Sequence, residues 1–230
     1  MKEKIKWAAI VIATIILATL FVRFQPFGVN SVSEVSTVRV ACVGDSITEL
    51  SNYTTDLQLL LGANYSVGNF GVSGSTVSLS SYKPYMYQPQ FQLAQEDEPN
   101  IVVIMLGTND AHSDLEQYNE SFEDDYNTLV NSFQNLDSQP QVLVVESPPV
   151  FNNSLDLNST FFSNTVIPHI QNVANYQNVP TVDVYDAFGN QANYTVDGVH
   201  PNSDGAELIA SQVYDTINQQ DDSSSVTSAP

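Results

Sequence analysis

The chain has 230 residues, and 26 acidic side chains against six Lys and Arg give it a formal net charge of −20 at pH 7. Beyond Arg23, the basic residues other than histidine are Arg39 and Lys83 alone. A surface of this charge repels the phosphates of nucleic acids and of anionic lipid headgroups, so neither is expected as a partner. The single cysteine, Cys42, has no disulfide partner within the chain and is expected to be a small core residue.

Residues 1–23 are expected to form an N-terminal signal anchor or a signal peptide. An uncharged, mostly apolar run over residues 7–22 follows lysines at positions 2, 4 and 6. In a helix this run spans roughly 24 Å, slightly less than a ~30 Å hydrocarbon layer. No clean small-x-small cleavage site follows it, which favours an uncleaved anchor. With the lysines in the cytoplasm, the rest of the chain is predicted to be extracytoplasmic and to touch the membrane through this segment only.

A polar tether is expected over residues 24–36, a folded domain over 37–218, and a disordered acidic and Ser-rich tail over 219–230. Export would suit glycosylation, although a chain this rich in Asn, Ser and Thr forms several acceptor triplets by chance. The oligomeric state is left open. The six Asn-x-Ser/Thr triplets begin at Asn52, Asn64, Asn119, Asn152, Asn158 and Asn193.

Short β-branched runs alternate with stretches of helical spacing through the expected domain. The strand-like runs are mostly apolar on both faces, as expected for parallel strands that helices cover on each side. The alternation predicts an α/β fold, a three-layer α/β/α sandwich with a central parallel sheet. In chain order we expect a strand at 38–43, a helix at 50–61, strands at 66–70 and 101–106, a helix at 115–136, a strand at 142–146, a helix at 158–176 bent or interrupted by Pro168, a strand at 181–184 and a helix at 203–217.

Ser46 follows the first expected strand directly, within Gly44-Asp45-Ser46. A serine between a buried strand and a helix is lifted out of the sheet, beside the free N–H groups of the first helical turn. In sheets of this kind the functional crevice lies at the carboxyl ends of the strands. Because Gly71, Asn109 and the loop before the last helix fall at the same edge, we expect them to lie near Ser46.

A nucleophilic serine needs a general base, and the chain offers three histidines. His200 stands three residues after Asp197, which is well placed to orient its ring, and it is the predicted base. His169 lies in a helix-like stretch and is interpreted as an ordinary surface or core residue. His112 follows the Asn109 loop and is expected at the rim of the site, where it could touch the substrate.

The negative charge that develops during acyl transfer needs donors that are already in position. Three are predicted: the backbone N–H of Ser46, the backbone N–H of Gly71, where glycine allows close approach, and the side-chain amide of Asn109. Taken alone, a glycine more often marks a turn and an asparagine more often caps one. No metal site is indicated, because three scattered histidines are too sparse for a metal-binding cluster.

Together these segments resemble the conserved blocks of the SGNH, or GDSL-type, esterase and lipase superfamily. The resemblance covers about residues 38–217 and implies a flavodoxin-like three-layer fold, a structural role for Asp45 and no cofactor. It implies that Ser46 is the nucleophile, His200 the base and Asp197 its orienting acid, with Ser46, Gly71 and Asn109 as the oxyanion donors. The matching blocks are Gly-Asp-Ser at 44–46, Asn69-x-Gly71 with Gly74, Gly-Thr-Asn-Asp at 107–110 and Asp197-x-x-His200-Pro201.

The predicted function is therefore hydrolysis of carboxylic esters through a covalent acyl-enzyme. Thr48 excludes the nucleophile elbow of the α/β-hydrolases, which needs glycine at that position. Short acyl or O-acetyl esters on extracellular glycans are the preferred substrates. The alternatives are lysophospholipid or thioester hydrolysis on the same fold, and a non-catalytic, surface-anchored binding domain. The aromatic stretch 82–87 lines an acyl or sugar pocket, or else packs within its own loop.

Overall fold

The computed structural model describes residues 37–227, with side chains described as far as residue 220. The expected anchor at 1–23, the expected tether at 24–36 and the last three residues lie outside this range. Among the helices of residues 37–227, none is both long enough and apolar enough to cross a bilayer.

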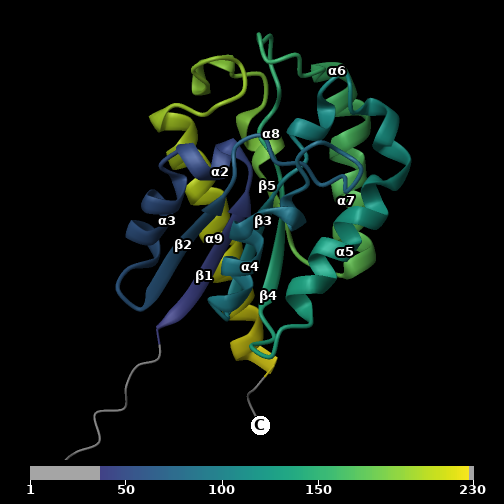
Figure 1. Cartoon of the computed structure of the whole chain (residues 1–230). Helices are drawn as coiled ribbons and strands as arrows, with labels where there is room; N and C mark the ends of the chain where they lie inside the picture. The colour runs from purple at the N-terminus through teal and green to yellow at the C-terminus, as the bar shows by residue number, and fades with distance from the viewer. Residues whose placement is uncertain (1–36, 228–230) are drawn as a thin grey trace, which may run out of the picture. The chain divides into compact units, whose positions relative to one another are not determined.

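A five-stranded parallel sheet forms the centre of the domain, in the order β2-β1-β3-β4-β5 (Figure 1). This is the order of flavodoxin-like sheets, in which the ligand crevice lies beyond the carboxyl ends of β1 and β3, where the direction of winding reverses. The predicted fold class is confirmed, and each expected strand lies within two residues of an observed one. The strands are β1 (Val38–Gly44), β2 (Tyr65–Gly71), β3 (Ile101–Met105), β4 (Gln141–Glu146) and β5 (Thr181–Asp183).

Helices cover both faces of the sheet, and Figure 1 shows α3 and α9 on one side with α5 and α7 on the other. Side chains of β1 alternate between the two layers: Val40 and Cys42 pack on the α3 and α9 side, and Ala41 and Val43 on the α5 and α7 side. The helices are α2 (Ser46–Leu50), α3 (Tyr53–Leu61), α4 (Pro89–Glu96), α5 (Phe122–Gln134), α6 (Ser159–Phe161), α7 (Ile167–Gln177), α8 (Val184–Phe188) and α9 (Ser203–Thr227).

Two of the expected helices are less regular than predicted. The helix expected at 50–61 is split, because Ser51 adopts an extended conformation between α2 and α3. The segment expected to be helical from 115 begins as a 3₁₀ helix over Glu116–Ser121 and becomes α-helical only at Phe122. Apolar spacing located both helices, but it did not resolve these local breaks.

Pro168 was expected to bend or interrupt its helix, and the irregularity that the structure shows is a π turn just before it. The chain is helical from Ser159 to Gln177, with a π-helical turn over Phe162–Val166 directly before α7. Pro168 lies in the first turn of α7, where the π turn before it has already broken the regular α-helical hydrogen-bond pattern. The wide π turn moves the break upstream of the proline.

Two unpredicted helices and two boundaries also differ from the expectation. The helices α4 and α8 were not predicted, since with eight and five residues they are too short for a clear apolar period. The strand expected to end at Val184 ends at Asp183, whose carboxylate accepts a 2.9 Å hydrogen bond from the Asp186 amide and so starts α8. Finally, α9 continues to Thr227, through most of the stretch expected to be a disordered tail.

Candidate active site

Ser46 is positioned by an abrupt passage from β1 into α2. Gly44 ends β1, and a Cβ atom at this position would lie 2.0 Å from Thr48 Oγ1, so no larger residue fits. Asp45 then caps α2, and its carboxylate accepts a 2.9 Å hydrogen bond from the Ile47 amide. Ser46 is the first residue of the helix, so its own N–H belongs to the unpaired donors of the first turn.

Asp45 is buried and braces the loops around Ser46. Burial raises its pKa to about 6, although the hydrogen bond from Ile47 and the nearby His200 act in the opposite direction. One carboxylate oxygen holds the start of α2, and the other lies 3.3 Å from Asn109 Nδ2. These contacts match the structural role that the family resemblance implies.

His200 reaches Ser46 across 154 residues of sequence. Its Nε2 lies 2.8 Å from Ser46 Oγ, and its Nδ1 lies 2.7 Å from Asp197 Oδ2. The other oxygen of Asp197 accepts hydrogen bonds from the backbone amides of Val199 (3.0 Å) and His200 (2.8 Å). Gly198 allows this tight loop, because it adopts φ = +90°, a conformation that other residues rarely take.

These hydrogen bonds also set the charge of Asp197. Burial raises the pKa of its carboxyl, but the hydrogen bonds from the His200 ring and from the two amides outweigh burial and hold the pKa below its ordinary value of 3.8. An ionised carboxylate at Nδ1 keeps the proton of a neutral imidazole on that nitrogen. His200 Nε2 is then free to accept the hydroxyl proton of Ser46.

Asn109 brings a side-chain amide to the same edge of the sheet. It follows β3 and opens a short 3₁₀ turn, Asn109–Ala111. Its Nδ2 donates to the Ser75 carbonyl oxygen at 3.0 Å and approaches Asp45 Oδ2 at 3.3 Å. The second contact is long for an N–H···O hydrogen bond, so a stronger acceptor can replace it at little cost.

Asp110 ties the Asn109 loop to the loop that follows β2. Its two carboxylate oxygens accept hydrogen bonds of 2.9 Å from the amides of Val77 and Ser78. Burial raises the pKa of Asp110 to about 7, against these two hydrogen bonds. Asp110 belongs to the Gly-Thr-Asn-Asp block of the sequence. Its hydrogen bonds to amides 33 and 32 residues away could not be predicted from that block.

Gly71 does not present a free amide. Its N–H donates a 3.0 Å hydrogen bond to Asn69 Oδ1, and a Cβ atom at Gly71 would lie 2.3 Å from the Glu49 backbone nitrogen. The structural need for glycine is therefore close packing against α2, and this argues against Gly71 as an oxyanion donor. Gly74, three residues later, adopts φ = +73°, and within residues 37–227 its amide has no hydrogen-bond acceptor.

Two charged side chains, Glu49 and Lys83, hold Ser73 and so fix the peptide unit that carries the Gly74 N–H. Glu49 Oε2 accepts a 2.6 Å hydrogen bond from the Ser73 amide and a second from its hydroxyl. Lys83 Nζ donates to the Ser73 carbonyl oxygen at 2.7 Å. Because a trans peptide is planar, the Gly74 N–H points away from the oxygen that Lys83 holds. Among the site residues, Gly74, Glu49 and Lys83 were not assigned roles from the sequence.

The sequence and the fold are similar to those of known proteins. The profile of the GDSL-like lipase/acylhydrolase family matches residues 42–208, more than half of the chain. The chain belongs to this family. An acetylxylan esterase from Xylanibacter ruminicola is 31% identical in a 199-residue alignment that covers 75% of this chain and 42% of that protein. The chain thus spans less than half the length of this relative.

Solved structures share the fold of this GDSL-like family member at low sequence identity. An inhibitor-bound aryl esterase from M. smegmatis superposes with a TM-score of 0.66 and 19% identity, over 80% of this chain and 99% of the other. A carbohydrate acetylesterase from Sinorhizobium meliloti gives a TM-score of 0.66 and 20% identity, over 80% and 100%. An acetylxylan esterase from Geobacillus stearothermophilus gives 0.64 and 22%, over 79% and 94%. The resemblance to the SGNH superfamily is confirmed.

The other two histidines of this family member lie outside the hydrogen-bonded set around Ser46. His169 Nδ1 lies 2.5 Å from Glu123 Oε1, and its ring packs on Phe122, so it is a partnered residue between two helices. His112 is three-quarters buried, with its Nε2 3.9 Å from Asp156 Oδ2. His112 therefore stands on the Asn109 loop, as expected, but hydrogen-bonds to none of the residues around Ser46.

Cys42 lies in the core, and burial raises its pKa to about 12. This fits the small core residue expected from the sequence. Within residues 37–220, no three His, Cys, Asp or Glu side chains are arranged to hold a metal ion.

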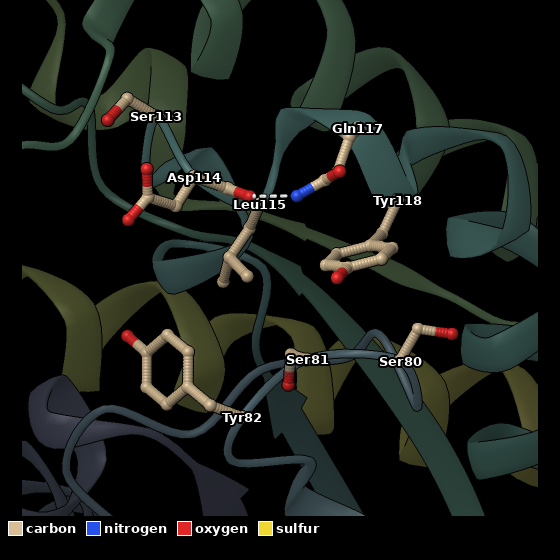
Figure 2. Close-up of a pocket in the computed structure, with 8 residues that line it drawn as sticks. All are labelled: Ser80, Ser81, Tyr82, Ser113, Asp114, Leu115, Gln117 and Tyr118. Carbon is tan, nitrogen blue, oxygen red and sulfur yellow. Dashed lines mark hydrogen bonds between the residues drawn. The ribbon is translucent and has the colours of Figure 1, made fainter.

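Two separate hollows lie near the carboxyl edge of the sheet. The smaller, of about 280 Å³, contains Ser46 and His200 and is otherwise lined by Leu50, Ser51, Val196 and Pro201. The larger, of about 660 Å³, lies between residues 80–82 and 113–118 (Figure 2). They share no lining residue. Of the residues around the larger hollow, only Tyr82 belonged to a stretch that the sequence had marked for a pocket.

Proposed function

We propose that this chain is a serine ester hydrolase in which Ser46 is the nucleophile, His200 the general base and Asp197 the residue that orients it. The observation that carries the proposal is the continuous chain of hydrogen bonds from Asp197 through His200 to Ser46 Oγ, with distances of 2.7 and 2.8 Å. Membership of the lipase/acylhydrolase family supports the same reaction class.

In the proposed mechanism, Ser46 Oγ attacks the ester carbonyl carbon while His200 Nε2 takes the hydroxyl proton. The ionised Asp197 stabilises the imidazolium that forms. The tetrahedral intermediate then collapses, the carbon–oxygen bond to the alcohol breaks, and His200 returns the proton to the leaving alkoxide. Water attacks the acyl-enzyme by the same steps, with His200 again as the base, and releases the carboxylic acid and free Ser46.

The oxyanion would be held by the N–H of Ser46, the N–H of Gly74 and the side-chain amide of Asn109. Gly74 replaces Gly71 in this proposal because the Gly71 amide already donates to Asn69 Oδ1, whereas the Gly74 amide has no acceptor in residues 37–227. Asn109 can turn its second hydrogen from Asp45, 3.3 Å away, to the more strongly negative oxyanion. Donors fixed before the reaction favour the transition state.

The proposed substrates are short acyl esters, in particular O-acetyl groups on glycans. Support comes from the acetylxylan esterase that is 31% identical and from the carbohydrate acetylesterase with the same fold. The hollow at Ser46 is small and is bordered by Leu50 and Val196, two exposed apolar side chains. A short acyl group can be covered there, whereas the chain of a lysophospholipid would extend beyond it.

We further propose that the domain acts outside the cytoplasm, held at the membrane through the N-terminal segment. The support is sequence alone: the apolar run 7–22 and the lysines that precede it. Mature protein that begins beyond Arg23 when its N-terminus is sequenced would contradict retention of the anchor.

The test of the reaction is a panel of 4-nitrophenyl esters, from acetate to palmitate, with the full chain. We expect the highest kcat/KM for acetate and a loss of at least about 10³-fold in Ser46→Ala. Ser163→Ala, which removes a hydroxyl bound only to its own helix region, is the matched control and should keep wild-type activity. Equal activity in Ser46→Ala and wild type would refute the mechanism, and preference for palmitate would favour the lysophospholipase alternative. Inactivity on these esters and on acetylated glycans would favour the binding domain.

A further inference from the structure

The larger hollow is formed by two loops that follow neighbouring strands. Ser80, Ser81 and Tyr82 come from the loop between β2 and α4, and residues 113–118 come from the loop between β3 and α5. Figure 2 shows the rings of Tyr82 and Tyr118 on its two sides, with the Leu115 side chain between them. We call this space the tyrosine hollow.

The tyrosine hollow is joined to the loops that carry the proposed oxyanion donors. On one wall, the Ser75 carbonyl oxygen accepts from Asn109, and Thr76 hydrogen-bonds to Ser81. On the other wall, Ser113 stands four residues after Asn109, so their Cα atoms are at most about 14 Å apart. Asn109 Nδ2 in turn lies 3.3 Å from Asp45, the residue before Ser46, so these loops connect the hollow to the neighbourhood of Ser46.

The lining combines an exposed tyrosine, Tyr82, and a half-buried one, Tyr118, with free polar groups. Tyr82 is 69% exposed, so its ring is not used for packing, and neither its hydroxyl nor that of Tyr118 hydrogen-bonds within residues 37–227. Gln117 Nε2 donates to the Asp114 backbone oxygen at 2.8 Å, which orients the amide and leaves its oxygen available. The Asp114 carboxylate likewise has no protein donor in this part of the chain.

This combination suits a sugar ring. The C–H faces of a pyranose pack against aromatic rings, and its hydroxyl groups donate to carboxylate and amide oxygens. No basic side chain lines the hollow, whereas Asp114 does, and the chain as a whole carries a charge of −20. Uronates, phosphates and sulfated sugars would be repelled, so the lining disfavours a negatively charged ligand.

We propose that the tyrosine hollow binds the neutral sugar units of a glycan whose O-acyl group is presented to Ser46. The inference rests on the proposed ester hydrolysis and adds to it the part of the substrate that leaves as the alcohol. Tyr82 and Tyr118 hold the sugar faces, and Asp114 and Gln117 accept hydrogen bonds from its hydroxyl groups.

The kinetic test compares an acetylated neutral xylo-oligosaccharide with 4-nitrophenyl acetate, which carries no sugar unit. For Tyr82→Ala and Tyr118→Ala in the full chain we expect kcat/KM on the oligosaccharide to fall about ten-fold, chiefly through KM, and kcat/KM on 4-nitrophenyl acetate to stay within about two-fold. Tyr82→Phe keeps the ring and should retain most of the oligosaccharide activity. Tyr176→Ala removes a tyrosine that is 79% exposed on α7 and should change neither.

Binding is tested separately from catalysis. Titration calorimetry of Ser46→Ala with the unacetylated xylo-oligosaccharide should show binding, and the double variant Ser46→Ala/Tyr82→Ala should bind about ten-fold more weakly. An oligogalacturonate of equal length should bind at least about ten-fold more weakly than the neutral oligosaccharide.

The two proposals fail in different ways. If wild type hydrolyses 4-nitrophenyl acetate but the tyrosine variants lose nothing on the oligosaccharide, or if Ser46→Ala binds no neutral oligosaccharide, the sugar-binding role of the hollow is wrong while ester hydrolysis stands. If wild type hydrolyses neither ester but the calorimetric binding and its loss are observed, ester hydrolysis is wrong and the hollow remains a sugar site.

Discussion

The molecule contains two histidine–carboxylate pairs of nearly the same local geometry. His200 Nδ1 lies 2.7 Å from Asp197, and their side chains are 26% and 37% exposed. His169 Nδ1 lies 2.5 Å from Glu123, and those side chains are 25% and 38% exposed. The nitrogen–oxygen distance, the ring nitrogen involved and the exposed fractions of the side chains would allow either pair to be the base and orienting acid of a catalytic site.

The difference lies on the far side of each ring. His200 Nε2 meets the hydroxyl of Ser46 at 2.8 Å. Within residues 37–227, no hydroxyl hydrogen-bonds to the ring of His169, which instead packs on Phe122, and Asn172 shares the carboxylate of Glu123. One pair ends at a possible nucleophile, and the other links α5 to α7.

The lesson is that a histidine–carboxylate pair does not by itself indicate catalysis. Such a pair also serves to satisfy two polar side chains between helices, because each partner supplies what the other needs when partly buried. What distinguishes the first pair is a third group at hydrogen-bond distance, the hydroxyl of Ser46, whose own backbone N–H is an unpaired donor of the first turn of α2.

Matched amide substitutions test this distinction most strongly. Asp197→Asn should lower kcat on 4-nitrophenyl acetate by about 10⁴-fold, because an amide in place of the carboxylate no longer stabilises the imidazolium or holds the reactive tautomer. Glu123→Gln makes the same change in the other pair and should leave kcat within about two-fold. Steady-state kinetics of both full-length variants measures the difference. Similar losses in the two variants would remove the basis for assigning catalysis to one pair.

The three-residue spacing of Asp197 and His200 predicted their contact correctly. The contact between Glu123 and His169 could not be predicted from the sequence. Asp197 and His200 are three residues apart, and Gly198 permits the turn between them, so the contact is local. Glu123 and His169 are 46 residues apart on two helices, and their contact depends on how α5 and α7 pack. His169 was rightly interpreted as an ordinary residue, but its partner was not foreseen.

The same difference between local and distant contacts explains which other features could be predicted from the sequence and which could not. The strands and the parallel three-layer fold were predicted from apolar runs, because buried parallel strands carry a strong pattern. The choice between Gly71 and Gly74 was not, since it depends on the Asn69 side chain taking the Gly71 amide and on the positive φ of Gly74. Neither the backbone angle nor the hydrogen bond is visible in a glycine-rich block.

The proposed oxyanion donors give the next largest expected effect, and they lie on the loops around Ser46 and not around His169. Asn109→Ala should lower kcat by about 10² to 10³-fold with little change in KM, because the amide is needed most when charge has developed on the carbonyl oxygen. The matched control is Asn172→Ala, which removes the amide that donates to Glu123 at 2.8 Å and should leave kcat unchanged. A rise in KM without a fall in kcat would place Asn109 in substrate binding and not in oxyanion stabilisation.

Lys83 should give a smaller effect, because in the proposed mechanism it would act on the oxyanion only through the peptide unit of Ser73 and Gly74. Lys83→Met removes the 2.7 Å hydrogen bond to the Ser73 carbonyl oxygen and leaves the Gly74 amide less well fixed. We expect kcat to fall up to about ten-fold, with KM nearly constant and partial recovery in Lys83→Arg.

Arg39 provides the control for Lys83, since these are the basic side chains of residues 37–220 apart from histidine. Arg39 Nε donates to the Glu98 backbone oxygen at 3.0 Å, at the start of β1 and away from Ser46. Arg39→Met should change thermal stability only. An equal fall in kcat in both variants would show a general loss of stability and not positioning of the Gly74 amide.

The smallest expected effect concerns the stability of the second pair. The hydrogen bond from Asn172, and after it the contact with His169, hold the pKa of Glu123 below its ordinary value of 4.5, although burial acts in the opposite direction. A carboxyl whose pKa is lower in the folded protein than in the unfolded chain stabilises the fold above the ordinary value, and this contribution is lost as the pH falls through the lower, folded-state pKa. Because the Glu123 side chain is 38% exposed, solvent screening limits the contribution at neutral pH to about 1 kcal/mol or less.

Glu123→Gln should therefore lower the free energy of unfolding slightly at pH 7, and the difference from wild type should shrink as the pH is lowered below 4.5. Urea denaturation of both proteins across this range measures it. Asp45 and Asp110, whose pKa values burial raises, change the stability of both proteins in the opposite sense and cancel in the difference. A difference that stays constant with pH would mean that the variant disturbs packing between α5 and α7. A difference that shrinks, with activity unchanged, would establish the His169 pair as a purely structural counterpart of the pair at Ser46.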